Sequence, residues 1–235
     1  MRKGYMRKLM MVVFVLMVAV AARADTVWLT LEGTGGNNNG SYYVYPYNFA
    51  LTGSSPTSTA YVAPGSSPAI TALICDDFGH DIYVSEHWQA TVSTGSAILT
   101  NGQMVANGLQ TNTTKAYEDA AYLYLQLVAN PTSTNSVYIN ETIWALFNPT
   151  AHTDYGSNST VQSWFSQAQT NSSLADLGKV VLYTPVGGTQ VPGTDGLPQE
   201  MFGSAPVPEP ASLALFASGL FGLAGVMRRK LHKSS

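Results

Sequence analysis

The stretch "ICDDFGHDIYVSEHW" holds the densest group of reactive side chains in this sequence. It contains the only cysteine, and four further side chains in it are candidate metal ligands for a metal-dependent hydrolase: Asp76, Asp77, His80 and Asp81. Their spacing matches neither the histidine pair of a zinc-binding helix nor the acids and glycine of an EF-hand loop. We therefore predict no metal site. The segment is interpreted as a turn in which the two adjacent acids cap backbone amides and Gly79 takes a left-handed conformation.

Cys75 could in principle act as a nucleophile, with a nearby histidine as its base. Two carboxylates follow it directly, and their charge disfavours the thiolate. The chain also has no Gly-x-Ser-x-Gly elbow and no phosphate-binding glycine loop. Cys75 is therefore predicted to be a small buried hydrophobe that closes a core strand. The chain is predicted to be non-enzymatic and to need no cofactor.

The first half of the chain has the patterns of strands. Alternating or short apolar runs predict strands at 26–32, 40–53 and 69–75, and a hairpin over 81–94 that turns near Ser85 and Glu86. A last strand is predicted at 179–185. In this arrangement the reactive stretch follows directly after the predicted strand at 69–75.

The second half has the periodicity of helices, which are predicted at 115–130, 136–147 and 160–169. Asn-Pro pairs end the first two, and Glu118 and Asp119 are expected in the first turn of the first helix. Strands, then helices, then a strand predict an α+β fold: an antiparallel β-rich sandwich or sheet with an inserted group of about three helices.

Charge is strongly segregated along the 235 residues. Only Lys115 and Lys179 accompany the 14 acidic residues between Asp25 and Glu209, which gives this middle part a formal charge of −12. The other nine basic residues lie near the two ends. Such a body cannot neutralise a row of phosphates, so nucleic acid is excluded as a partner.

The amino terminus has the order of a secretory signal peptide. A basic segment, "MRKGYMRK", precedes the apolar run "LMMVVFVLMVAVA", and Ala22 and Ala24 supply the small residues of a cleavage site before Asp25. Residues 1–24 are therefore predicted to be a signal peptide that directs export of the chain.

The carboxyl terminus carries a second targeting pattern. Residues 211–227 are uncharged and just long enough for a transmembrane helix, and the basic cluster Arg228, Arg229 and Lys230 would stay in the cytoplasm. Before this span stands a stiff segment in which two prolines flank one acid, Val207-Pro208-Glu209-Pro210.

The order of this motif, span and basic tail resembles the PEP-CTERM sorting signal. The resemblance implies that an exosortase, a membrane transpeptidase of Gram-negative bacteria that make extracellular polysaccharide, reads the signal and removes the tail. It implies a precursor held transiently in the inner membrane and a product at the cell surface or outside the cell. The predicted organisation is a signal peptide at 1–24, an exported α+β domain at 25–186, a Pro/Gly-rich linker at 187–206 and the sorting signal at 207–235.

A weaker resemblance concerns the body. A cysteine that closes a strand, the helix "AAYLYLQL" and then "INETIWALF" are similar to the thioester domains of bacterial surface adhesins. There a cysteine thiol is joined to a glutamine side chain, and the corresponding pair here would be Cys75 and Glu141. A glutamate is a poor acyl donor, so the pair is interpreted as vestigial.

Tyrosines crowd between Tyr42 and Tyr47. Aromatic rings stack on sugar faces, so extracellular polysaccharide is a candidate partner, although tyrosine also simply favours strands. The leading prediction is a non-enzymatic structural or adhesive protein of the cell surface or exopolysaccharide matrix. The alternatives are a thioester-like or glycan-binding adhesin module and the metal-dependent hydrolase.

Overall fold

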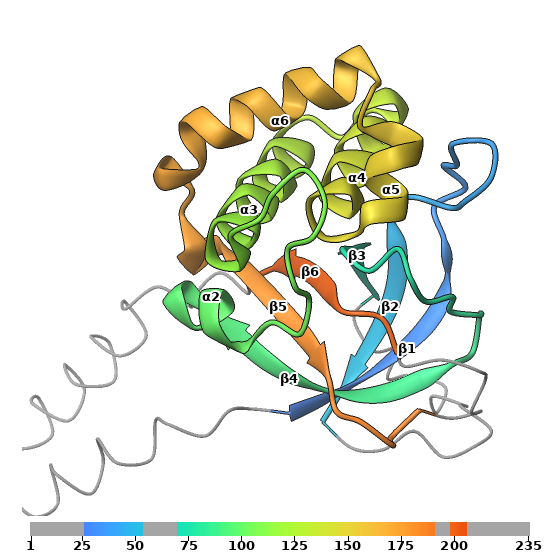
Figure 1. Cartoon of the computed structure of the whole chain (residues 1–235). Coiled ribbons are helices and arrows are strands. Elements are labelled where there is room, and N and C mark those ends of the chain that lie inside the picture. Colours follow the sequence, from blue (N-terminus) through green and yellow to red (C-terminus); the bar gives the residue numbers. More distant parts are fainter. Residues whose placement is uncertain (1–25, 54–69, 191–197, 206–235) are drawn as a thin grey trace, which may run out of the picture. The chain divides into compact units, whose positions relative to one another are not determined.

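Six antiparallel strands close into a barrel in the order β1-β2-β3-β6-β5-β4, and β4 pairs again with β1 (Figure 1). The computed structural model describes residues 26–53, 70–190 and 198–205. The strands are β1 (Thr26–Thr34), β2 (Tyr47–Thr52), β3 (Ile70–Cys75), β4 (His87–Thr94), β5 (Val180–Pro185) and β6 (Met201–Ser204). The predicted antiparallel α+β class is confirmed, but the sheet is a closed barrel, which the strand patterns alone did not indicate.

Side chains that alternate along the strands fill the barrel. Leu29, Phe49, Leu73 and Trp88 are all fully buried, and the rings of Phe49 and Trp88 meet edge to face with centroids 5.5 Å apart. A single apolar face on each strand is enough to form this interior because successive side chains point to opposite sides of a sheet. Closure gives each of the six strands a neighbour on both sides, although β3 and β6 pair over only two residues each.

Two predicted strands are shorter than expected. Residues 81–86 form a loop in place of the first arm of a hairpin, and Ser85 has a positive φ of 77°. Both backbone groups of Leu31 in β1 hold this loop. The Leu31 N–H donates to the carbonyl of Glu86, and the Leu31 carbonyl accepts the N–H of Ser85. Residues 40–46 likewise stay outside β2. Aromatic residues give both segments a strand-like composition. Several of these residues, Tyr42, Tyr43 and Tyr83, line a cavity and do not belong to a strand.

The sixth strand lies in a segment whose composition predicts a spacer. β6 fills the place between β3 and β5, where Phe202 pairs with Ile74 on one side and Leu182 on the other. Met201 and Phe202 are fully buried. Prolines and glycines dominate the preceding residues, but the short apolar run of β6 belongs to the barrel.

Five α-helices are present among the described residues: α2 (Ile98–Asn101), α3 (Thr113–Ala129), α4 (Ser133–Phe147), α5 (Pro149–Tyr155) and α6 (Ser159–Asn171). Short 3-10 turns occur at Gly95–Ala97, Ser172–Leu174 and Leu177–Lys179. The three predicted helices are confirmed as α3, α4 and α6. Asn148 ends α4 as predicted, and its side chain also accepts the N–H groups of Thr150 and Ala151, which starts the unpredicted α5 with Pro149 in its first turn.

The start of α3 differs from the prediction. The helix begins at Thr113 behind the cap Asn112, whose side chain accepts the N–H of Lys115. Glu118 and Asp119 therefore lie beyond the first turn. Asp119 is fully buried and pairs with Lys115. It therefore contributes to the packing of α3 and does not interact with the helix dipole.

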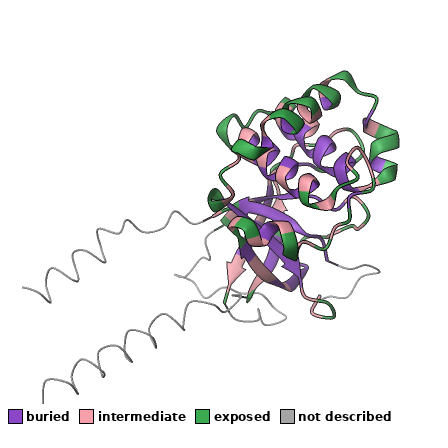
Figure 2. Ribbon diagram, turned by 60° about the vertical axis from the view of Figure 1, so that its left-hand side comes forward, coloured by how far each residue is buried: buried purple, intermediate pink, exposed green. Residues whose placement is uncertain are grey.

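The helices lie between β4 and β5 in sequence and cover one end of the barrel (Figure 1). Figure 2 shows buried residues on their inward faces and exposed ones outside. Side chains of α3 and α4 pack with Ile74, Leu182 and Phe202 from the barrel in one core. The chain divides after Ser204 into two compact units, and the barrel with its helices belongs to the first.

Within the ranges that the structure describes, no helix combines the length and apolar character that a bilayer crossing requires. The predicted signal peptide, its cleavage site at Ala22, Ala24 and Asp25, and the predicted span at 211–227 lie outside those ranges, as do Val207, Pro208, Glu209, Pro210, Arg228, Arg229 and Lys230.

Candidate functional site

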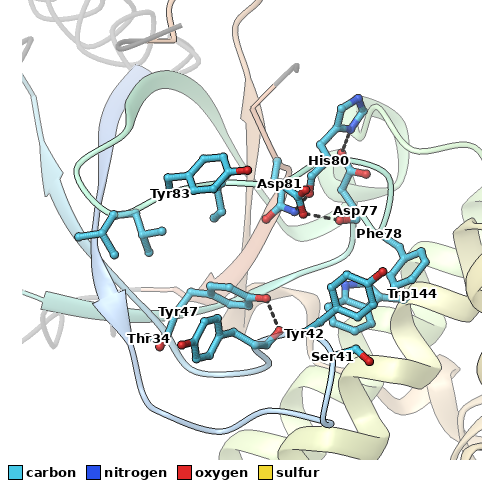
Figure 3. A pocket seen from close by; sticks show the side chains of 15 residues that line it. Thr34, Ser41, Tyr42, Tyr47, Asp77, Phe78, His80, Asp81, Tyr83 and Trp144 are labelled. Carbon is cyan, nitrogen blue, oxygen red and sulfur yellow. Dashed lines mark hydrogen bonds and ion pairs between the residues drawn. The ribbon is translucent and has the colours of Figure 1, made fainter. Parts of the chain in front are cut away.

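A cavity of about 440 Å³ opens where three parts of the chain meet (Figure 3). Its walls come from β1, from residues 41–43 together with Tyr47 at the start of β2, and from loop 77–84 that follows β3. Trp144 of α4 and Gln199 just before β6 complete the lining. The reactive stretch after β3 therefore forms one wall of a real cavity.

Aromatic rings form one side of this cavity. Tyr42 lies edge-on to Phe78 with ring centroids 5.2 Å apart, and Phe78 and Trp144 are 5.3 Å apart. Tyr155 of α5 supports both, at 5.8 Å from Phe78 and 6.3 Å from Trp144. We call Tyr42, Phe78, Trp144 and Tyr155 the aromatic cluster. Such edge-to-face and tilted contacts fix ring orientations as well as burying area.

A narrow hairpin presents Tyr42. Val44 donates its N–H to Asn37 and Asn39 donates to Tyr42 across the hairpin, while the side chain of Asn39 accepts the N–H groups of Ser41 and Tyr42. The same Asn39 donates to a carboxylate oxygen of Glu141 at 3.0 Å and to the Tyr155 hydroxyl at 3.3 Å. Glu141 thus positions Tyr42 through Asn39.

Three more tyrosines line the cavity: Tyr43, Tyr47 and Tyr83. Tyr43 and Tyr83 are 56% and 58% exposed, so their rings are available to a ligand, whereas Tyr47 is only 7% exposed. The Tyr47 hydroxyl donates to the carbonyl of Tyr43 at 2.5 Å, which holds the hairpin against β2 (Figure 3). Burial strongly raises the pKa of Tyr47, so it remains a neutral donor.

The polar side of the cavity is built by the turn after β3. Asp77 accepts the N–H of Gly79 at 2.8 Å and holds the imidazole of His80 at 2.6 Å. Gln199 donates to the carbonyls of Asp77 and His80 and so ties the turn to the segment before β6. The turn interpretation is confirmed for Asp77, but Gly79 does not have a positive φ, and Asp76 caps no amide.

Cys75 closes β3 and is fully buried, as predicted. Its thiol donates to the Asp77 carbonyl at 3.1 Å and accepts the Asp77 N–H at 3.2 Å. Burial raises the pKa of the Cys75 thiol well above its usual value, and the carboxylates of Asp77 and Asp76 raise it further. A neutral thiol in this environment is a poor nucleophile.

The residue of α4 that bonds to Cys75 is Asn140 and not Glu141. The Asn140 side chain donates to the Cys75 carbonyl at 3.0 Å and accepts the N–H of Tyr45 at 3.0 Å. The Glu141 carboxylate is instead bonded to Asn39. Burial raises the pKa of Glu141, and the bond from Asn39 opposes this shift. Asn140 and Glu141 together join α4 to the strand end and the hairpin.

We expect the Cys75 thiol to be intact and inaccessible. In the native chain it should react with a thiol reagent far more slowly than after unfolding in denaturant, and unfolding should release one titratable thiol per chain. Intact mass should equal the sequence mass after processing. A mass lower by one water, about 18 Da, that then rises by the full mass of an added small amine as the thiol is released would instead show a thioester bond between Cys75 and Glu141.

Asp76 is not among the residues that line the cavity. It is fully buried, and neither carboxyl oxygen has a hydrogen-bond partner among the residues described. Burial raises its pKa well above the usual value, and the nearby charge of Glu200 raises it further. Glu200 accepts bonds from the Tyr117 hydroxyl at 2.5 Å and from Thr184 at 2.9 Å. Burial and the charge of Glu200 therefore favour the neutral acid of Asp76.

Sequence reasoning missed several residues of this site. Asn39, Phe78, Asn140 and Tyr155 gave no signal because each acts through a contact far away in the sequence. Glu200 was placed in a spacer by its proline-rich surroundings. Within ranges 26–53, 70–190 and 198–205, no group of three or more His, Cys, Asp or Glu side chains converges closely enough to hold a metal ion.

Comparison with known families identifies one segment. The PEP-CTERM protein-sorting motif matches residues 206–230. Comparison with curated proteins and with solved structures gives no significant match. The chain therefore carries a PEP-CTERM sorting signal at its carboxyl end, which supports an exported protein that an exosortase sorts. The barrel and its cavity must be interpreted from their own geometry.

Proposed function

We propose that the folded domain is a non-catalytic carbohydrate-binding module that its sorting signal delivers to the cell surface or extracellular matrix. The signal peptide would start export, the inner membrane would hold the precursor transiently, and an exosortase would remove the tail. The module would then bind extracellular polysaccharide in the cavity beside the aromatic cluster.

One observation carries this proposal: the cavity presents aromatic rings to solvent. Tyr42, Tyr43 and Tyr83 are 44%, 56% and 58% exposed at its rim, although large apolar side chains elsewhere in the described domain are mostly buried. Pyranose rings have apolar faces that stack on aromatic rings, while their hydroxyls bond to carboxylates and amides. Asp77, Asp81 and Gln199 offer such polar groups in the same lining.

The engagement of the polar groups favours binding over catalysis. Both oxygens of Asp77 already accept bonds, from Gly79 and His80. The thiol of Cys75 is fully buried and its pKa is raised, so Cys75 does not present an activated nucleophile to the cavity. Fixed side chains with satisfied bonds are typical of a preorganised binding site.

Replacing Tyr42 with alanine tests the proposal. The full chain, in a neutral detergent, should be retarded by a soluble oligosaccharide or by the extracellular polysaccharide of its host in affinity electrophoresis. Tyr42→Ala should weaken binding about 2- to 10-fold, since one aromatic stacking contact contributes about 0.5–1.5 kcal/mol.

Tyr138→Ala is the matched control, because Tyr138 lies on α4 and lines no part of the cavity. It should bind like the unmodified chain. If neither the unmodified chain nor any variant binds a saccharide in a panel of neutral, anionic and cationic polymers, the proposed function is wrong.

A further inference from the structure

The acids that line the cavity have no lysine or arginine partner among the described residues. Both lysines of the described domain are engaged elsewhere: Lys115 pairs with Asp119, and Lys179 pairs with Asp176 at 3.3 Å. Asp77 holds His80, but no ion pair with the exposed Asp81 is present among the described residues. Asp81 therefore offers an uncompensated carboxylate to whatever enters the cavity.

This carboxylate lies beside aromatic rings. The lining places Asp81 in one loop with Phe78 and Tyr83, and opposite Tyr42 (Figure 3). The faces of tyrosine, phenylalanine and tryptophan rings attract organic cations, and a nearby carboxylate adds a direct ion pair. Rings and carboxylate together suit a ligand that has an apolar face and a positive charge.

We infer that the ligand of this cavity is a polysaccharide with free amino groups, in which a protonated amino sugar meets Asp81 while its ring stacks on the aromatic side. This inference rests on the proposed carbohydrate-binding function and names its ligand class. The overall charge of the protein also favours a cationic ligand, because the body between the two termini carries a formal charge of −12. That charge attracts a cationic polymer and repels anionic ones.

Three oligosaccharides of equal length test the inference by isothermal titration calorimetry with the full chain in neutral detergent. They are an oligomer of glucosamine, its N-acetylated form and a neutral glucan, at a mildly acidic pH at which the amines are protonated. The glucosamine oligomer should bind at least about tenfold more tightly than the other two, and added salt should reduce this preference.

Asp81→Asn should remove most of that preference. Because Asp81 is exposed and the substitution conserves its shape, the variant should fold, which circular dichroism would check. Glu118→Gln removes one carboxylate from α3, outside the cavity, and should leave the preference unchanged.

The outcomes separate the two proposals. Equal binding of all three oligomers would overturn the amino-sugar inference and leave the carbohydrate-binding function standing. A preference that Asp81→Asn and Glu118→Gln reduce equally would assign it to the overall charge and overturn the role of the cavity. No binding of any oligomer would overturn the amino-sugar inference, and the panel of neutral, anionic and cationic polymers would then decide the carbohydrate-binding function.

Discussion

Replacing Pro208, Glu209 and Pro210 together with alanine is expected to abolish removal of the carboxyl-terminal segment. These residues lie within the matched PEP-CTERM motif, and the sequence predicts that two prolines keep the segment around one acid extended before the apolar run. Alanines would remove the charge and allow helix to extend through the recognition segment. In cells with an active exosortase, the variant should accumulate as the precursor, which immunoblotting and intact mass would show by its retained tail.

Pro192→Ala is the matched control, since Pro192 lies in the same proline-rich stretch but outside the matched residues. It should be processed normally. The unmodified chain should itself accumulate as the precursor in cells without an exosortase. Equal processing of the triple-alanine variant and the unmodified chain would show that the sorting protease does not read this motif.

Short-range patterns made much of the fold predictable. The alternation in "TVWLTLE" and the apolar run "AITALIC" correspond to β1 and β3, because each signal depends on neighbouring residues only. The same holds for α3 and α4, whose ends are marked by Asn130 and Asn148. These elements need no knowledge of their partners to be recognised.

Closure of the barrel could not be predicted in this way. It depends on β4 pairing with β1 and on β6 entering between β3 and β5, and both are long-range contacts. A six-residue strand has the same pattern in an open sheet, a sandwich and a barrel. For β6 the local composition was misleading, since proline and glycine nearby outweighed four residues of strand.

The candidate site was only half visible in the sequence. The stretch after Cys75 and the tyrosines between Tyr42 and Tyr47 were recognised separately, by residue type and density. That they face each other across one cavity follows from the hairpin that Asn39 fixes to Glu141 and Tyr155. The sequence suggested Glu141 as a possible thioester partner of Cys75, but the Glu141 carboxylate accepts a hydrogen bond from Asn39. Its position explains how α4 supports the cavity.

Phe202→Ala is expected to destabilise the domain more than any other single substitution considered. Phe202 is fully buried in β6, pairs with Ile74 and Leu182 across two strands, and lies with its ring 6.2 Å from Tyr117 of α3. Its removal would leave a cavity where the barrel meets the helices, at a cost of about 3–5 kcal/mol. Thermal unfolding followed by circular dichroism should show a midpoint lower by roughly 6–20 °C.

Phe165→Ala provides the matched control, because Phe165 lies on α6 and is only partly buried against the same core. Loss of the Phe165 side chain should lower the midpoint by much less, because this side chain buries less apolar area on folding than Phe202 does. If both substitutions shift the midpoint equally, β6 contributes no more than a surface contact and the barrel is not closed by it. A much larger effect at Phe202 would establish that the folded domain extends through Ser204, past the residues whose composition predicts a spacer.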